Sequence, residues 1–282
     1  MKKKRYKNGM KVGIIGIIIN LFLATIKIIL SYLSNSVSIL ADALNNLSDM
    51  TSSILMLFGF KLSSKKATKK HPYGYARYEY ISSFLISIFM IIMSLLFIIE
   101  SITKIIKPDN LIINLNTYLI LFTTLIIKLV QYVYYKKMSY KLNSLSIEAT
   151  TLETRNDIIT NISILISMII MNKQNINIDG YIALIVSFIL IKSSIEMLKE
   201  SISILIGKNP TDEQINEIKN KILIHKEIEK INKLIIHNYG ENINYINIHL
   251  KLNKKEKMNN IRKLINKIEK EFDDKITIQI DL

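Results

Sequence analysis

The sequence predicts an α-helical membrane protein with six transmembrane helices, followed by a small α+β ferredoxin-like domain in the cytoplasm. The chain has 282 residues, and 49% of them are hydrophobic, with the apolar residues gathered in long runs over roughly the first 205 positions. Six of these runs reach the length of about 20 residues that a helix needs to cross a bilayer. The remainder shows the short periodic patterns of a soluble domain. We therefore expect a membrane domain at 1–206 and a cytoplasmic domain at 207–282.

The charge of the connecting segments predicts the topology. The N-terminus and the segments 61–78 and 135–143 are strongly basic, whereas the intervening connections carry little charge. Cytoplasmic loops carry an excess of Lys and Arg, so both termini are expected in the cytoplasm of a protein in the cell membrane, as an even number of spans also requires. No cleavable signal peptide is expected, because the basic start runs into an apolar stretch of full membrane length. The predicted spans are 11–33, 36–60, 79–103, 112–134, 145–171 and 178–203.

The tail carries the pattern of an αββαβ domain. The segment 207–210, Gly-Lys-Asn-Pro, ends the last span, and Thr211 followed by Gln214 is a capping box that starts a helix. Alternating residues predict strands at 232–238 and 243–251. A second helical stripe and a third strand close the domain, marked by Met258, Ile261, Ile265, Ile268 and Phe272 and then by Ile276, Ile278 and Ile280.

Composition excludes several classes of site. The chain has no cysteine, which excludes a disulfide framework, a thiolate metal site and a cysteine nucleophile. The formal net charge of +15 could suggest nucleic acid. Because the basic residues cluster beside the predicted spans, we instead expect the lipid bilayer as partner and no nucleic acid.

Acidic residues lie in the interior of two predicted spans, the second and the fifth. Acidic side chains at a helix centre cost about 2.5–3.5 kcal/mol each on insertion scales, so such residues face the bundle interior or a water-filled cavity. The residues are Asp42 and Asp49 in the second span and Glu153 and Asp157 in the fifth. Carboxylates at such positions indicate a functional site.

The spacing of these residues predicts a cation site. Asn45 and Asp49 are four residues apart, as are Glu153 and Asp157, and residues at i and i+4 share one helix face. Two such pairs facing each other would present four oxygen-bearing side chains to a hard divalent cation. Asp42, about one turn from Asn45, could guide the ion or pair with a cation. A buried Asn can also serve only as a hydrogen bond between helices, and this alternative stays open for Asn45.

Three motifs, in this order, resemble the cation diffusion facilitator family: SVSILADALNNLSD, HPYGYARYE and EATTLETRND. The resemblance covers nearly the whole chain. It implies a divalent-metal/proton antiporter, usually a homodimer, that exports metal from the cytoplasm by alternating access. It implies a transport site at Asn45, Asp49, Glu153 and Asp157, no enzymatic activity and no resident cofactor, with protons as the counter-ion.

Departures from the family pattern favour manganese. Zinc-selective members carry one histidine and three aspartates at the site, whereas this chain has Asn45 and Glu153 and no imidazole. A site made only of oxygen donors suits Mn²⁺ and lacks the nitrogen that favours Zn²⁺. Manganese-exporting members have an Asn on the second span and usually an Asp at the position of Glu153. Transport of Fe²⁺, Co²⁺ or Zn²⁺ remains an alternative.

Two peripheral sites of the family are incomplete in this chain. In the basic loop His71 is present, but Thr68 and Tyr75 stand at the other ligand positions, so His71 is expected to bond to backbone rather than to metal. In the tail, His249 and Asp281 match positions that bind regulatory metal in the family, but one or two of the other ligand positions are not matched, and a weak metal site is the alternative. A polar strand face is the expected role of both.

Two alternative functions belong to other classes. A membrane enzyme that binds Mg²⁺-diphosphate also uses acidic motifs, but no basic pocket for diphosphate is apparent within the spans. A sensor that binds metal in its tail would need no acid pairs deep in the membrane. Both alternatives predict that sealed vesicles show no metal flux.

Overall fold

The computed structural model describes residues 2–34, 37–107, 115–174, 178–241, 243–253, 258–272 and 275–281. It divides into two compact units. The first comprises Met1–Lys66 and Tyr78–Ile202, and the second comprises Ala67–Arg77 and Ser203–Leu282. The domain boundary at 206 stays a prediction, and no sequence pattern indicates that 67–77 belongs with the C-terminal unit.

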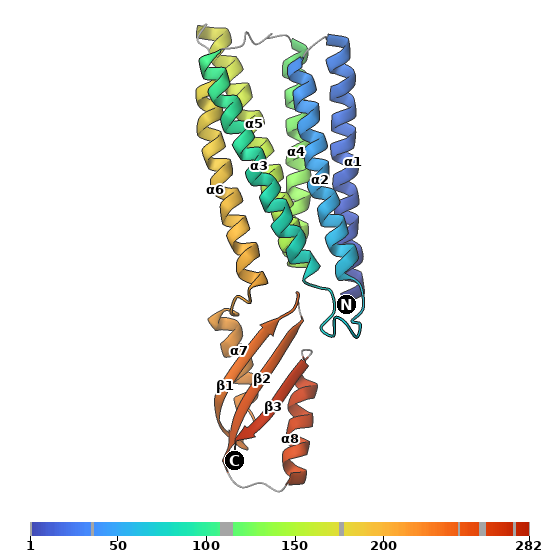
Figure 1. The fold of residues 1–282 in the computed structure, drawn as a ribbon, viewed down its shortest axis with the longest axis vertical. Coiled ribbons are helices and arrows are strands. Elements are labelled where there is room, and N and C mark those ends of the chain that lie inside the picture. The colour runs from blue at the N-terminus through green and yellow to red at the C-terminus, as the bar shows by residue number, and fades with distance from the viewer. Residues whose placement is uncertain are drawn as a thin grey trace. The chain divides into compact units, whose positions relative to one another are not determined.

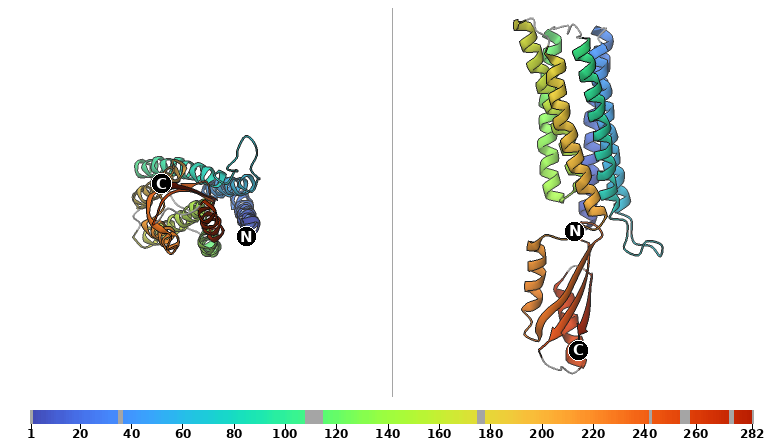
Figure 2. Two further views of the ribbon diagram at one scale, coloured as in Figure 1. Left: turned by 90° about the horizontal axis from the view of Figure 1, so that it is seen from below. Right: turned by 60° about the vertical axis from the view of Figure 1, so that its left-hand side comes forward.

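Long helices running side by side build the first unit (Figure 1 and Figure 2). None of them contains a proline, which would remove a helical hydrogen bond. Each predicted span falls within one of these helices, give or take a few residues at the ends. In the described part of the chain the helices are α1 (Lys2–Ser34), α2 (Val37–Ser63), α3 (Tyr78–Ile106), α4 (Leu115–Leu142), α5 (Leu145–Gln174) and α6 (Asp179–Leu205).

Four of these helices are long and apolar enough to cross a membrane, within the described residues: α1, α3, α4 and α6. Large apolar side chains such as Ile18, Leu96, Val130 and Phe188 remain exposed on them, as expected for a surface that faces lipid. The helices α2 and α5 are of similar length and carry the acidic motifs. The chain is therefore a multi-pass membrane protein, and six spans remain a prediction.

Arg5 links three helices of the first unit through an ion pair and a hydrogen bond. Arg5 on α1 makes a two-pronged contact with Glu79 on α3, with both Nη–Oε distances at 2.8 Å. Its Nε donates to the backbone oxygen of Leu142, at the end of α4, at 2.8 Å. The Glu79 side chain is only 3% exposed and the Arg5 side chain 13%. The basic start of the chain thus has a structural role besides its predicted role in topology.

Buried serines line the seam between α3 and α6. Their hydroxyl groups face one another in three pairs, with Oγ–Oγ distances from 2.9 to 3.5 Å. The small side chains let the helix backbones approach closely, a common device in membrane bundles. The pairs are Ser83 with Ser201, Ser94 with Ser194, and Ser101 with Ser187.

The second unit has the element order αββαβ, as the sequence predicts. It comprises α7 (Asp212–Leu223), β1 (Ile228–Asn238), β2 (Asn244–Leu252), α8 (Met258–Glu271) and β3 (Lys275–Asp281). In the described part, β2 lies between β1, which is antiparallel to it, and β3, which is parallel (Figure 1). Both helices contribute to one core with the sheet, through Ile222 of α7 and Ile268 of α8. The Thr211–Gln214 capping box is confirmed.

The segment 67–77 packs on the turn between β1 and β2. Tyr73 stacks on Tyr239 with the ring centroids 4.3 Å apart. The guanidinium of Arg77 donates to the backbone oxygen of Asn238 at 2.7 Å and lies over the Tyr239 ring. Gly240 has a φ of +149°, and a Cβ at this position would overlap Ala76, so the close approach requires glycine.

Candidate metal centre

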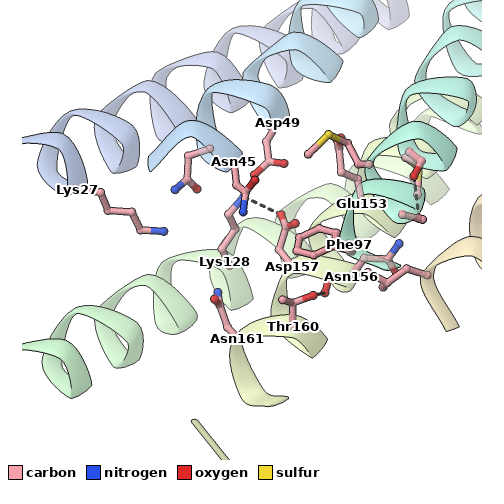
Figure 3. Close-up of a pocket in the computed structure, with 15 residues that line it drawn as sticks. Lys27, Asn45, Asp49, Phe97, Lys128, Glu153, Asn156, Asp157, Thr160 and Asn161 are labelled. Atoms are coloured by element: carbon pink, nitrogen blue, oxygen red, sulfur yellow. Dashed lines mark hydrogen bonds and ion pairs between the residues drawn. The ribbon is translucent and has the colours of Figure 1, made fainter. Parts of the chain in front are cut away.

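A cavity of about 70 Å³ lies inside the helix bundle of the first unit (Figure 3). This volume is enough for several water molecules or for an ion with part of its water shell. The lining side chains are mainly polar or charged, and α1 to α6 supply them. They include all four residues of the predicted site: Asn45, Asp49, Glu153 and Asp157.

The helical spacing accounts for this placement. Asn45 and Asp49 occupy one face of α2, and Glu153 and Asp157 occupy one face of α5. Ser52, less than one turn beyond Asp49, donates a hydrogen bond across the interface to Glu153 Oε1 at 2.6 Å. The acid pairs of the two helices therefore border a common cavity.

The structure adds a residue that the sequence reasoning missed. Lys128 of α4 extends its ammonium group between the two aspartates, 2.7 Å from Asp49 Oδ2 and 2.8 Å from Asp157 Oδ2 (Figure 3). It also donates to Asn20 Oδ1 of α1 at 3.1 Å, and its side chain is 3% exposed. A lysine in the middle of an apolar run was the available signal, since such a residue is expected to pair with an acid.

The four predicted residues border one cavity but do not converge on one point. Within the described residues, no three His, Cys, Asp or Glu side chains are arranged so that they could hold a metal ion. The ammonium of Lys128 lies between Asp49 and Asp157, and Glu153 is turned toward Ser52. An ion that binds both aspartates has to take the place of this ammonium.

The neighbouring polar side chains are also buried. Lys27 of α1 lines the cavity and is 2% exposed. Asn156 of α5 donates to Ser193 of α6 at 3.3 Å, which ties these helices together beside the cavity. Gln131 lies about one turn from Lys128 on α4, and its Nε2 donates to the Tyr135 hydroxyl at 3.1 Å. Its Oε1 has no hydrogen-bond partner in the described part of the chain.

The peripheral candidates lie elsewhere. His71 is exposed in the 67–77 segment, where its backbone N–H donates to Thr68, and its ring lies 4.8 Å from that of Tyr75. His249 is half-buried on β2, level with Gln279 of β3. The side chains of Asp42 and Asp281 lie outside the described part of the structure.

A multi-pass helix bundle around a buried, charged cavity has the architecture of a membrane transporter. Comparison with known proteins identifies the family: the chain matches the cation efflux transmembrane domain over residues 13–206 and belongs to the cation efflux family. The resemblance to the cation diffusion facilitators is thereby confirmed. The protein is a cation efflux transporter rather than an enzyme, which excludes the Mg²⁺-diphosphate alternative.

Relatives of the chain are known in several bacteria. The manganese efflux system protein MneP of Bacillus subtilis is 26% identical over 241 residues, 82% of this chain and 80% of that protein. The manganese efflux system protein MneS of the same organism is 26% identical over 195 residues, 69% and 67% of the two chains. A cadmium, cobalt and zinc/H⁺-K⁺ antiporter of Bacillus velezensis is 26% identical over 255 residues, 89% and 81%.

Proposed function

We propose that this protein exports Mn²⁺ from the cytoplasm, binding the ion through Asn45, Asp49, Glu153 and Asp157. The observation that carries the proposal is the chemistry of the cavity, in which amide and carboxylate oxygens are available and no imidazole or thiolate is among the lining residues that the structure describes. Hard oxygen donors suit Mn²⁺. The thioethers of Met90 and Met93 also line the cavity, but they are soft ligands that suit other metals. The names of MneP and MneS support the same ion.

Exchange for protons is the second part of the proposal. Carboxylates have to be deprotonated before they bind a metal, so Mn²⁺ and protons compete for Asp49, Glu153 and Asp157. A site that opens alternately to the two sides of the membrane then couples the two fluxes. Six spans, with both termini in the cytoplasm, fit this cycle, because Asp49 of α2 and Glu153 and Asp157 of α5 line the cavity rather than face lipid.

The C-terminal domain, 207–282, is proposed to hold two copies of the chain together as a homodimer. The family resemblance supports this assignment. A second copy would double the number of transport sites without altering the chemistry of either cavity.

The test measures metal uptake into inside-out vesicles that contain a metal-sensitive dye and carry an imposed proton gradient. We expect Mn²⁺ flux well above Zn²⁺ flux for the unaltered protein, and no flux above empty vesicles for Asp157→Ala. Lys192→Gln is the matched control, because Lys192 is exposed on α6 and does not line the cavity. Unchanged Mn²⁺ export by Asp157→Ala would refute the site.

A zinc or iron exporter of the same family is the alternative. The name of the Bacillus velezensis relative favours zinc among its ions. Dominant Zn²⁺ or Fe²⁺ flux in the same vesicles, lost in Asp157→Ala, would support this alternative and would retain the site.

A further inference from the structure

We infer that Lys128 is a tethered cation that holds the transport site when no metal is bound, and that a divalent ion displaces it toward Asn20 and Gln131. The inference rests on the proposed function, because it assumes that Asp49 and Asp157 are metal ligands. It assigns to α4 a direct part in binding, whereas the sequence placed the site on α2 and α5.

The first support is geometric. The Lys128 ammonium lies 2.7 Å and 2.8 Å from the carboxylate oxygens of Asp49 and Asp157. Hard divalent ions bind carboxylate oxygens at about 2.0–2.6 Å. A metal ion and the ammonium therefore cannot occupy the space between the two aspartates together. Binding at both aspartates requires that Lys128 move.

The second support is the charge of the cavity. Three carboxylates line it together with the ammonium groups of Lys27 and Lys128. When all are ionised, these groups leave one negative charge, which is too little to hold a divalent ion well. If Lys128 withdraws from the carboxylates, the local charge becomes favourable for the ion. The divalent ion is then attracted by a net charge of two negative units rather than one.

The third support is a place for the displaced group. Asn20 Oδ1 already accepts a hydrogen bond from Lys128 at 3.1 Å. Gln131 is 1% exposed, and its Oε1 is a buried acceptor with no partner in the described residues. Gln131 is three residues from Lys128 on α4, and residues at this spacing share one helix face. An ammonium that bonds this oxygen would remove the cost of leaving it unpaired.

The arrangement explains how the site discriminates by charge. A monovalent ion offers the two aspartates no more charge than the tethered ammonium does, whereas a divalent ion offers twice as much. Lys128 therefore acts as an internal competitor that sodium and potassium do not displace. The discrimination needs no change in the protonation of the lysine.

The test is Mn²⁺ binding to the full chain in lipid nanodiscs, by titration calorimetry with MnCl₂ at one fixed pH. We expect Lys128→Gln to lower the apparent Kd by about ten-fold or more, because a competing unit charge has been removed. Mn²⁺ should also raise the Tm of Lys128→Gln by more than that of the unaltered protein, because the metal-free variant leaves two aspartates without their cation.

Two matched substitutions serve as controls. Lys192→Gln removes an exposed lysine from α6 and should leave the Kd unchanged. Lys27→Gln removes another cavity charge while the Lys128 bridge stays in place, and its effect should be smaller. An equal effect of Lys27→Gln and Lys128→Gln would refute the specific role of Lys128, as would a folded Lys128→Gln whose Kd is unchanged or higher.

A further variant keeps the inference testable if Lys128→Gln does not fold. Gln131→Met leaves the Lys128 ion pairs intact but removes the acceptor for the displaced ammonium, so the Kd should rise several-fold. An unchanged Kd would refute the displacement. Failure of the proposed function is distinguishable, because the unaltered protein would then bind no Mn²⁺, or Asp49→Ala would bind it equally well.

Discussion

Two buried ion-pair clusters of the first unit use similar charges in different ways. Arg5 forms two parallel contacts of 2.8 Å with Glu79, and its Nε donates a third hydrogen bond to a backbone oxygen. Lys128 instead bridges Asp49 and Asp157 beside a cavity of about 70 Å³. The first cluster joins the ends of helices, and the second borders the space that the proposed cargo would occupy.

The difference lies in the chemistry of the two cations. A guanidinium presents a rigid fork that matches one carboxylate, whereas an ammonium is a compact charge on a flexible stem. The Arg5 cluster is therefore suited to permanent structure. The Lys128 cluster is suited to exchange, because one point charge can be replaced by another. Substitutions in the two clusters separate these roles.

The largest effect is expected for Asp49→Asn. The substitution preserves side-chain shape but removes a charged ligand, and even the loss of an outer-shell partner of a metal site costs about 10–100-fold. Mn²⁺ uptake into vesicles should fall by at least the upper end of that range. Thermal unfolding should show that the protein is still folded. Retained uptake would contradict the assignment of metal binding to the Lys128 cluster and of a structural role to the Arg5 cluster.

Glu79→Gln should lower the stability of the protein and leave Mn²⁺ binding unchanged, which is the reverse of the effect expected for Asp49→Asn. It leaves the Arg5 guanidinium buried without its carboxylate, and breaking a buried ion pair costs about 3–5 kcal/mol. The free energy of unfolding, measured by denaturant titration and circular dichroism, should fall by a similar amount. The Kd for Mn²⁺ should not change in the protein that remains folded. A large change in Kd would show that the two clusters are coupled.

The double substitution Asn45→Asp with Glu153→His sharpens the account of the cavity. It introduces an imidazole, the donor type that favours Zn²⁺, and moves one carboxylate from α5 to α2, so the site then has one histidine and three aspartates. The ratio of Zn²⁺ to Mn²⁺ flux should rise by about ten-fold, which corresponds to a change of about 1.4 kcal/mol in relative affinity. The single change Glu153→Asp is the control and should leave the preference for Mn²⁺ in place.

The smallest effect is expected for Arg5→Lys. The charge is retained, but the two-pronged contact and the bond to the Leu142 oxygen cannot both be reproduced by an ammonium. A net loss of about 1 kcal/mol is expected, typical of one hydrogen bond. The same denaturant titration measures it. A loss as large as that of Glu79→Gln would mean that the fork geometry, rather than the charge, holds the helices together.

Much of the fold follows from local patterns. Long apolar runs without proline define the helices of the bundle, and alternating Ile246, Ile248 and Leu250 define the central strand that the structure buries. Residues spaced four apart on α2 and α5 predict a shared face, and the structure places both pairs at one cavity. These features depend on neighbours within a few turns, which a sequence displays directly.

Contacts between distant segments could not be predicted in this way. The partners of Lys128 lie on three other helices, so nothing near position 128 in the sequence indicates which acids it meets. The spacing of the acids predicts a cage of oxygen donors, but it does not indicate the ammonium of Lys128 that lies between Asp49 and Asp157. The packing of Tyr73 on Tyr239 likewise depends on the fold of the second unit.

The serine pairs between α3 and α6 have a mechanical consequence. Polar contacts between membrane helices contribute about 0.6 kcal/mol on average. Three such pairs hold the two helices together without fixing them rigidly, because most of these hydroxyl groups can also donate to a backbone oxygen of their own helix. Ser94 and Ser101 already have such an oxygen within 2.8 Å. Along this seam one helix can slide past the other while the serine hydroxyl groups of both helices stay hydrogen-bonded.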